Sequence, residues 1–248
     1  MSGHSKWSQI KRQKGANDVK RGAVFTKMGR EIAVAARAGG GDPDGNFRLR
    51  LAIERARAIN MPLDTIKRAI DKATGGGEGE QFEEIMYEGY GPGGVALIVE
   101  TATDNKNRTA ADVRSILTKA GGQLAGSGSV AWQFEQRGVI TLAPGGDTEE
   151  LELVAIDAGA DDVDSTGDQV EVFTKPAELE AVRRSLEAAG VKIESAELAM
   201  QAKNTVELDA TKARQALRLI ELLEDHDDVQ RVTANFEIPE EIMAEVAG

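Results

Sequence analysis

The 248-residue chain has no cysteine, and this absence excludes several kinds of chemistry at once. Disulfide bonds, thiolate zinc sites and thiol catalysis are ruled out, and the composition fits a reducing compartment. Only two histidines, His4 and His226, are available for metal binding or acid–base catalysis. Aromatic residues make up 4% of the chain, so we expect cores built mainly from Ala, Val, Ile and Leu.

Long apolar runs are missing too. No segment approaches the roughly 20 apolar residues of a membrane-spanning helix, and the N-terminus lacks the apolar core of a signal peptide. We therefore expect a cytoplasmic protein with no membrane partner. The common catalytic, phosphate-binding and dinucleotide-binding motifs are also absent. The sequence thus predicts no enzyme, no cofactor and no small-molecule substrate.

Positive charge is concentrated at one end of an acidic protein whose formal net charge is -12. Residues 1–75 hold 16 Lys and Arg against 7 Asp and Glu, whereas residues 76–248 hold 14 against 35. A basic lobe on an acidic body predicts a polyanionic partner bound at the basic end. The alternative interpretation is an ordinary solvated surface with a lysine-rich disordered segment.

Most residues predicted to contact nucleic acid lie within the first 30 positions. Their cations would neutralise phosphates, and Trp7 would either stack on a base or pack into the core. The run Asp104–Arg108 adds two cations, although helix capping by Asn105 or Asn107 explains the same run. The predicted contact residues are Lys6, Trp7, Lys11, Arg12, Lys14, Lys20, Arg21, Lys27, Arg30, Lys106 and Arg108.

Helical periodicity dominates the first 75 residues. It predicts helices at 8–14, 22–37 and 46–58, and another with Pro62 in its first turn. The glycines from Gly75 onward then form a linker. The predicted helical core is thin, so we expect this domain to be well ordered only when it packs on the body or on a partner.

Strands alternate with helices after the linker. We expect strands at 95–101, 129–134, 138–142, 162–164, 169–174, 191–200, 205–208 and 229–236, with a turn at 88–94. The expected helices cover 108–120, 148–158, 176–189 and 211–224. This order predicts an α+β fold, with an N-terminal helical domain followed by two ferredoxin-like α/β domains, one inserted in the other. The predicted domains are 1–78, 79–134 plus 204–248, and the insert 135–203.

Metal binding has weak support. His226 lies in EDHDD at the end of an expected helix, where the helix dipole and neighbouring carboxylates favour a cation. A metal ligand is the alternative, but no second ligand cluster accompanies it. The acidic stretches 78–88 and 161–168 suit solvated faces and turns, with Mg²⁺ coordination as the alternative. We therefore predict no metal site.

Several ordered motifs resemble those of the YebC/PmpR family. They are GHSKW (3–7), D-x-x-R-G (18–22), FTK (25–27), EGYGPGGVALIVE (88–100) and TDNKNRT (103–109). The similarity covers essentially the whole chain, which also resembles the mitochondrial translational activator of cytochrome c oxidase. The resemblance implies three domains, the first helical and the other two α/β, in a cytoplasmic DNA-binding transcriptional regulator. Some family members are instead linked to the ribosome, where they relieve translation stalled at proline-rich stretches.

The resemblance also implies roles for particular residues. By matched position, Lys6, Lys11, Lys14, Lys20, Arg21 and Lys27 face nucleic acid, whereas the role of Asn105, Asn107 and Arg108 is less defined. Gln13 stands where a basic residue or histidine is expected. We therefore predict a non-enzymatic, DNA-binding transcriptional regulator. The alternatives are a translation factor that binds ribosomal RNA or tRNA, a metal-dependent enzyme, and a protein-interaction scaffold.

Overall fold

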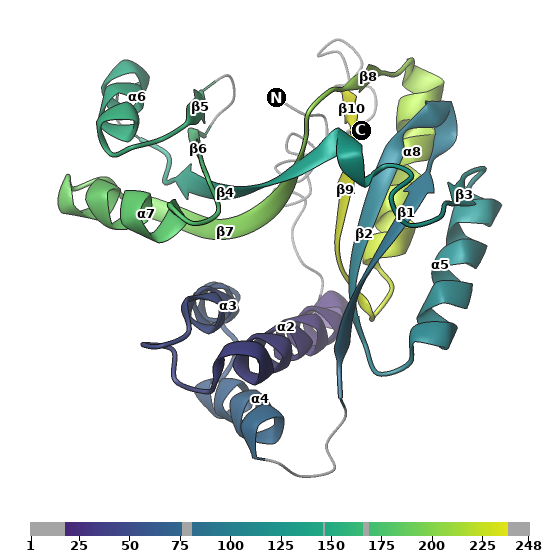
Figure 1. Cartoon of the computed structure of the whole chain (residues 1–248), viewed down its shortest axis with the longest axis horizontal. Coiled ribbons are helices and arrows are strands. Elements are labelled where there is room, and N and C mark those ends of the chain that lie inside the picture. Colours follow the sequence, from purple (N-terminus) through teal and green to yellow (C-terminus); the bar gives the residue numbers. More distant parts are fainter. Residues whose placement is uncertain (1–17, 76–80, 146, 166–168, 238–248) are drawn as a thin grey trace. The chain divides into compact units, whose positions relative to one another are not determined.

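The computed structural model describes residues 18–75, 81–145, 147–165 and 169–237, with side chains of the first helix from Gly22 onward. Contacts divide the chain into two compact units. One unit is the inserted segment 134–203, and the other is formed by the chain on both sides of it (Figure 1). The predicted helix at 8–14 lies outside the described residues.

Three of the described helices form the N-terminal part of the larger unit. They are α2 (Asp18–Gly39), α3 (Phe47–Ala58) and α4 (Leu63–Thr74), close to the predicted ranges except that α2 begins four residues earlier. Asn46 joins two of them, because its side chain accepts from the Leu49 N–H at the start of α3 and donates to the Ala35 carbonyl of α2. A small core of buried aliphatic side chains lies between the helices, including Ile32, Leu49 and Ile66.

The same unit contains a four-stranded antiparallel sheet in the order β3-β1-β2-β9. Two helices, α5 and α8, lie on one side of it (Figure 1) and share a core with β2 and β9 that includes Val99, Leu117 and Leu219. The bounds are β1 (Glu83–Tyr90), β2 (Ala96–Thr103), α5 (Lys106–Lys119), β3 (Gln123–Leu124), α8 (Ala210–Glu224) and β9 (Val229–Ala234). The 3-10 turn η1 (Pro92–Gly94) joins β1 to β2.

The inserted unit runs β4 (Phe134–Leu142), α6 (Thr148–Asp157), β5 (Asp162–Asp164), β6 (Glu171–Thr174), α7 (Leu179–Ala188) and β7 (Ile193–Ala202). Its strands form an antiparallel sheet in the order β5-β6-β4-β7. Gly138 in β4 allows the close packing of α7, because a Cβ there would lie 2.9 Å from the Cβ of Leu179. The chain therefore has the predicted α+β fold, and this unit shows the β-α-β-β-α-β order of a ferredoxin-like domain.

The structure corrects three local predictions. Residues 88–90 are the end of strand β1 rather than part of a turn. Residues 131–133 form a 3-10 turn, η2 (Ala131–Gln133), and the strand that begins at Phe134 belongs to the inserted sheet. The predicted strand 205–208 is β8 (Val206–Glu207), which pairs in parallel with β10 (Phe236–Glu237) outside the main sheet.

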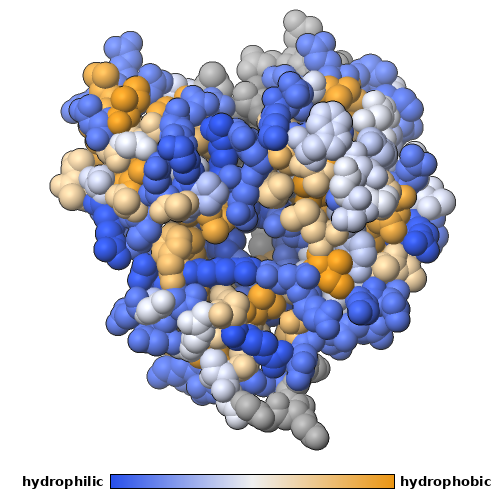
Figure 2. All heavy atoms as spheres, in the orientation of Figure 1, coloured by the Kyte–Doolittle hydropathy of each residue, from blue (hydrophilic) through white to orange (hydrophobic). Residues whose placement is uncertain are grey.

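Figure 2 shows a visible face covered mostly by hydrophilic residues, with hydrophobic ones in small groups. Large exposed apolar side chains include Trp132, Leu153 and Ile156. None of the described helices is both long enough and apolar enough to cross a bilayer.

Candidate nucleic-acid interface

The predicted contact residues fall into three groups. Lys6, Trp7, Lys11, Arg12 and Lys14 lie outside the described residues. Lys20 and Arg21 lie in the first turn of α2, where side chains are not described. The structure describes the side chains of the remaining four, which are Lys27, Arg30, Lys106 and Arg108.

Lys27 and Arg30 of α2 contact the chain itself. The Lys27 ammonium donates to the carbonyl oxygen of Glu224, the last residue of α8, where the helix dipole favours a cation. The Arg30 guanidinium forms a 2.6 Å ion pair with Asp228, and its central carbon lies 5.2 Å from the centroid of the Phe82 ring. These two cations therefore hold α2 to the end of α8 and to the loop that follows it.

Asp228 is the centre of a polar cluster that joins three parts of the larger unit. Its side chain is 2% exposed. Its carboxylate accepts hydrogen bonds from the hydroxyls of Thr109 at 2.6 Å and Thr103 at 3.2 Å. The Arg108 guanidinium donates to it at 2.9 Å, opposite Arg30. This set, the Asp228 cluster, brings together two predicted site residues that are far apart in the sequence.

The cluster holds Asp228 in its charged form. Burial by itself raises the pKa of the carboxyl group. The hydrogen bonds from Thr109 and Arg108 and the charges of Arg30 and Arg108 outweigh burial and lower the pKa from 3.8 to about 2. The same pairing raises the pKa of Arg108, through hydrogen bonds to Asp228 and Asp104.

This pKa predicts how acid affects stability. Because the pKa of Asp228 is lower in the folded protein than its unfolded value of 3.8, its contribution is complete above about pH 4 and is lost as pH falls toward 2. The shift corresponds to about 2 kcal/mol of unfolding free energy. Urea unfolding between pH 4.5 and 2.5 should show the difference between the native protein and Asp228→Asn shrinking with acid. A constant difference across that range would contradict the assignment.

The run Asp104–Arg108 acts as a helix start. Asn105, one of the two capping residues predicted from the sequence, caps α5, because its side-chain oxygen accepts from the Arg108 N–H at 3.1 Å. Arg108 also pairs with Asp104 at 2.7 Å. Lys106 is exposed. Arg108 is therefore held by two carboxylates of its own chain, and Lys106 extends into solvent.

Both ring nitrogens of His226 contact groups of the protein itself. Its Nδ1 accepts from the Asp228 N–H at 3.2 Å, and its Nε2 lies 3.3 Å from the Asp112 carboxylate. The backbone bond requires an unprotonated Nδ1, so Nε2 is the nitrogen that donates to Asp112. Within the residues that the structure describes, no three His, Cys, Asp or Glu side chains are grouped to hold a metal ion.

Comparisons with known proteins identify the family of this chain. Residues 5–76 match the family model described as the TACO1/YebC protein N-terminal domain, and residues 82–236 match the model of the TACO1/YebC second and third domain. The chain belongs to the TACO1/YebC family. A relative from Rubrobacter xylanophilus is 58% identical over 250 residues, which cover 100% of both chains. One from Moorella thermoacetica is 56% identical over 98% of both.

Both relatives are named probable transcriptional regulatory proteins, which supports a regulatory role for this TACO1/YebC protein. A crystal structure of a conserved hypothetical protein from Aquifex aeolicus has the same fold. It matches with a TM-score of 0.85 and 48% sequence identity, over 91% of this chain and 94% of that one.

The helical part of this TACO1/YebC protein presents further cations that the sequence did not single out as site residues. Arg37, Arg57 and Lys67 are exposed, and none forms an ion pair with a described residue. In contrast, Arg48 pairs with Glu84. In the sequence, Arg37, Arg57 and Lys67 contributed only to the overall charge count, which does not distinguish paired from unpaired side chains.

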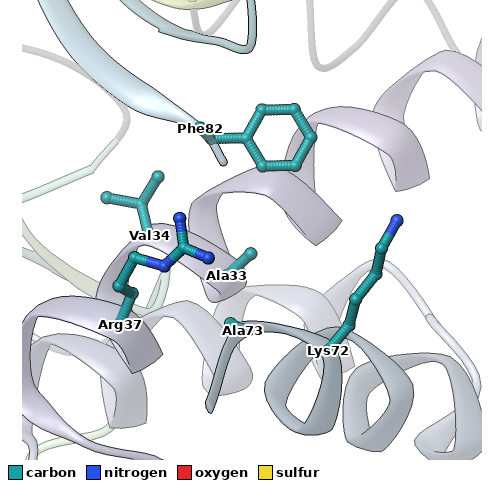
Figure 3. A pocket seen from close by; sticks show the side chains of 6 residues that line it. All are labelled: Ala33, Val34, Arg37, Lys72, Ala73 and Phe82. Carbon is teal, nitrogen blue, oxygen red and sulfur yellow. The ribbon is translucent and has the colours of Figure 1, made fainter. Parts of the chain in front are cut away.

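A cavity between α2 and α4 is too small to be the binding site. Figure 3 shows Arg37 on α2 and Lys72 on α4 at its edges, and the Phe82 ring, directly before β1, above them in this view. Its volume is about 20 Å³, which is enough for a single water molecule. Any partner of these cations must therefore bind outside, on the surface.

A second buried carboxylate, Glu88, was missed by the sequence analysis. It accepts from the backbone N–H groups of Gly128 at 2.6 Å, Val130 at 2.7 Å and Ala131 at 2.8 Å. Burial raises its pKa, but the three donors outweigh burial and the pKa is lowered. The loop that Glu88 fixes carries Trp132, which is 65% exposed and donates from Nε1 to the Ser129 carbonyl.

Proposed function

We propose that this TACO1/YebC protein is a non-enzymatic, cytoplasmic, DNA-binding regulator of transcription that holds nucleic acid through its basic helical domain. Two relatives named probable transcriptional regulatory proteins support the regulatory role. The division into domains 1–78, 79–134 plus 204–248, and 135–203 belongs to the same proposal.

The observation that carries the proposal is unpaired positive charge on an acidic protein. The basic segment 1–75 has a net charge of +9, against -21 for the rest. Arg37, Arg57 and Lys67 extend this charge into the described helices without carboxylate partners there. Each cation that contacts a phosphate releases counterions, which favours binding at low salt. The acidic body repels the same polyanion and directs it to the helical domain.

The predicted contact residues then divide into two roles. Lys27, Arg30 and Arg108 hold the helices against the sheet, since they bind Glu224 or Asp228. Direct phosphate contact is assigned to the N-terminal cations, Lys20, Arg21 and Lys106, with Trp7 beside them. This arrangement fixes orientation on nucleic acid and does not by itself read base sequence.

The test replaces Lys11, Arg12 and Lys14 by alanine. We expect weaker binding to duplex DNA of any sequence, and a salt dependence of log K that falls by about 0.9 for each phosphate that is no longer neutralised. Fluorescence anisotropy between 50 and 300 mM salt measures both.

A matched control removes the same charge elsewhere. Lys175→Ala, Arg184→Ala and Lys192→Ala take three exposed cations from the inserted unit and should leave the salt slope unchanged. An unchanged slope in the Lys11, Arg12 and Lys14 variant would contradict direct contact. Stronger binding to a ribosomal RNA hairpin than to duplex DNA of equal length would favour the translation-factor alternative.

A further inference from the structure

The sheet-bearing part of the larger unit contains an open groove that the proposed helical interface does not use. It lies where the β1–β2 turn meets the end of α5 and the exposed side of α8, and its volume is about 830 Å³. The side chains that extend into solvent along it are Lys119, Lys212, Gln215, Arg218 and Leu222.

One wall of the groove is nearly bare backbone. Gly93, Gly94 and Gly121 have φ values of +82°, +79° and +80°, which side-chain-bearing residues rarely adopt. A Cβ on Gly122 would lie 2.4 Å from the Tyr90 carbonyl oxygen, so the two turns approach closely only because this residue is glycine. The wall can therefore be approached by a bulky, extended ligand.

The groove continues past these glycines. A second hollow of about 420 Å³ shares Gly91, Gly94 and Gly121 with the first and is also lined by Tyr90 and Gln123. Tyr90 lies at an intermediate depth, with its hydroxyl 3.3 Å from the Ser129 carbonyl oxygen. A path that continues from one hollow into the next suits a linear polymer better than a compact metabolite.

The groove is basic in an acidic protein. The chain has 42 Asp and Glu residues, yet no Asp or Glu of the described residues lines either hollow. Lys119 and Arg218 are exposed and form no hydrogen bond or ion pair with a described residue. Lys212 donates from its ammonium to the Gln215 side chain at 3.4 Å. Three cations are therefore available to a ligand.

Helix stabilisation does not explain these positions. Lys119 lies in the last turn of α5, where the dipole favours a cation. Lys212, however, lies in the first turn of α8, where the dipole disfavours one, and Arg218 lies in the middle of that helix. Asp209, the N-cap of α8, binds the backbone N–H of Lys212.

We propose that this groove binds the phosphodiester backbone of a single nucleic acid strand, with Lys119, Lys212 and Arg218 on phosphates. Proteins that hold single strands follow the phosphodiester backbone with a basic groove in this way. The inference rests on the proposed nucleic-acid-binding function and adds a second contact surface to it. A duplex bound at the helical domain and a strand bound here would use different cations.

The test replaces Lys119, Lys212 and Arg218 by alanine in the full chain. Anisotropy with labelled single-stranded DNA and RNA 12-mers, between 50 and 300 mM salt, should show a salt slope lower by about 0.7 for each phosphate that is no longer neutralised, or about 2 in all. We expect at least tenfold weaker single-strand binding at the lowest salt. The two oligonucleotides show which kind of strand the groove prefers.

Two comparisons separate this inference from the proposed function. The Lys175, Arg184 and Lys192 alanine variant removes equal charge and should bind single strands like the native protein. The groove variant should keep the duplex affinity that the Lys11, Arg12 and Lys14 variant loses. If the native protein binds duplex DNA but the groove variant keeps the native single-strand slope, the groove inference alone is wrong. If the native protein binds neither nucleic acid, both proposals fail.

Discussion

Replacing Asp228 by alanine should destabilise the protein by about 3–5 kcal/mol, the range observed when one partner of a buried ion pair is removed. The Asp228 side chain is 2% exposed, and its carboxylate is shared by Arg30, Arg108 and the Thr109 hydroxyl. Without it, Arg30 loses its carboxylate partner, and Arg108 keeps only its ion pair with Asp104. Urea unfolding followed by circular dichroism measures the decrease in stability.

The neighbouring Asp227 provides the control. Its side chain is exposed, and its contact with Arg30 is made by its backbone carbonyl, which accepts a hydrogen bond. Asp227→Ala removes the same formal charge one residue away and should change the free energy of unfolding by less than about 0.5 kcal/mol. Equal effects of the two substitutions would show that the Asp228 cluster does not stabilise the fold. Asp228→Asn should fall between them, since it keeps an acceptor without the charge.

Replacing Glu88 by alanine should destabilise the protein by about 2–4 kcal/mol, because it leaves three backbone N–H groups without their acceptor. Those donors belong to Gly128, Val130 and Ala131, in the loop that carries Trp132. We therefore also expect a change in tryptophan emission. A Trp7→Phe background isolates the signal of Trp132, since the chain has two tryptophans.

Glu83→Ala is the matched control for Glu88. Both residues lie in β1, but Glu83 is exposed and Glu88 is 5% exposed. The control should leave both stability and emission close to native values. A Glu88→Ala protein with native emission and native stability would mean that the loop holds its conformation without the carboxylate.

Asp228 changes the interpretation of the charge pattern. The sequence predicted that Arg30 and Arg108 face nucleic acid, whereas in the structure both bind Asp228. Part of the basic character therefore holds α2 and α5 to the loop before β9. The cations left for a polyanion include Arg37, Arg57 and Lys67 on the helices, and Lys119, Lys212 and Arg218 along the groove.

Much of the secondary structure followed from local sequence. Asn46 and Asn105 cap helices as their side chains allow, and α4 begins directly after Pro62. The order of elements in the inserted unit was also predicted. These features depend on hydrogen bonds and packing between residues a few positions apart, which a sequence pattern records directly.

Tertiary structure decided the rest. The sequence predicted a strand at 129–134, but the N–H groups of Val130 and Ala131 donate to Glu88, which lies 42 and 43 positions earlier. Arg30 and Arg108 are separated from Asp228 by 198 and 120 positions. Whether a charged side chain is buried with a partner or exposed to a ligand depends on such distant contacts. The sequence alone therefore determined the family, the fold class and the charge imbalance, and the folded chain determined which charges are available.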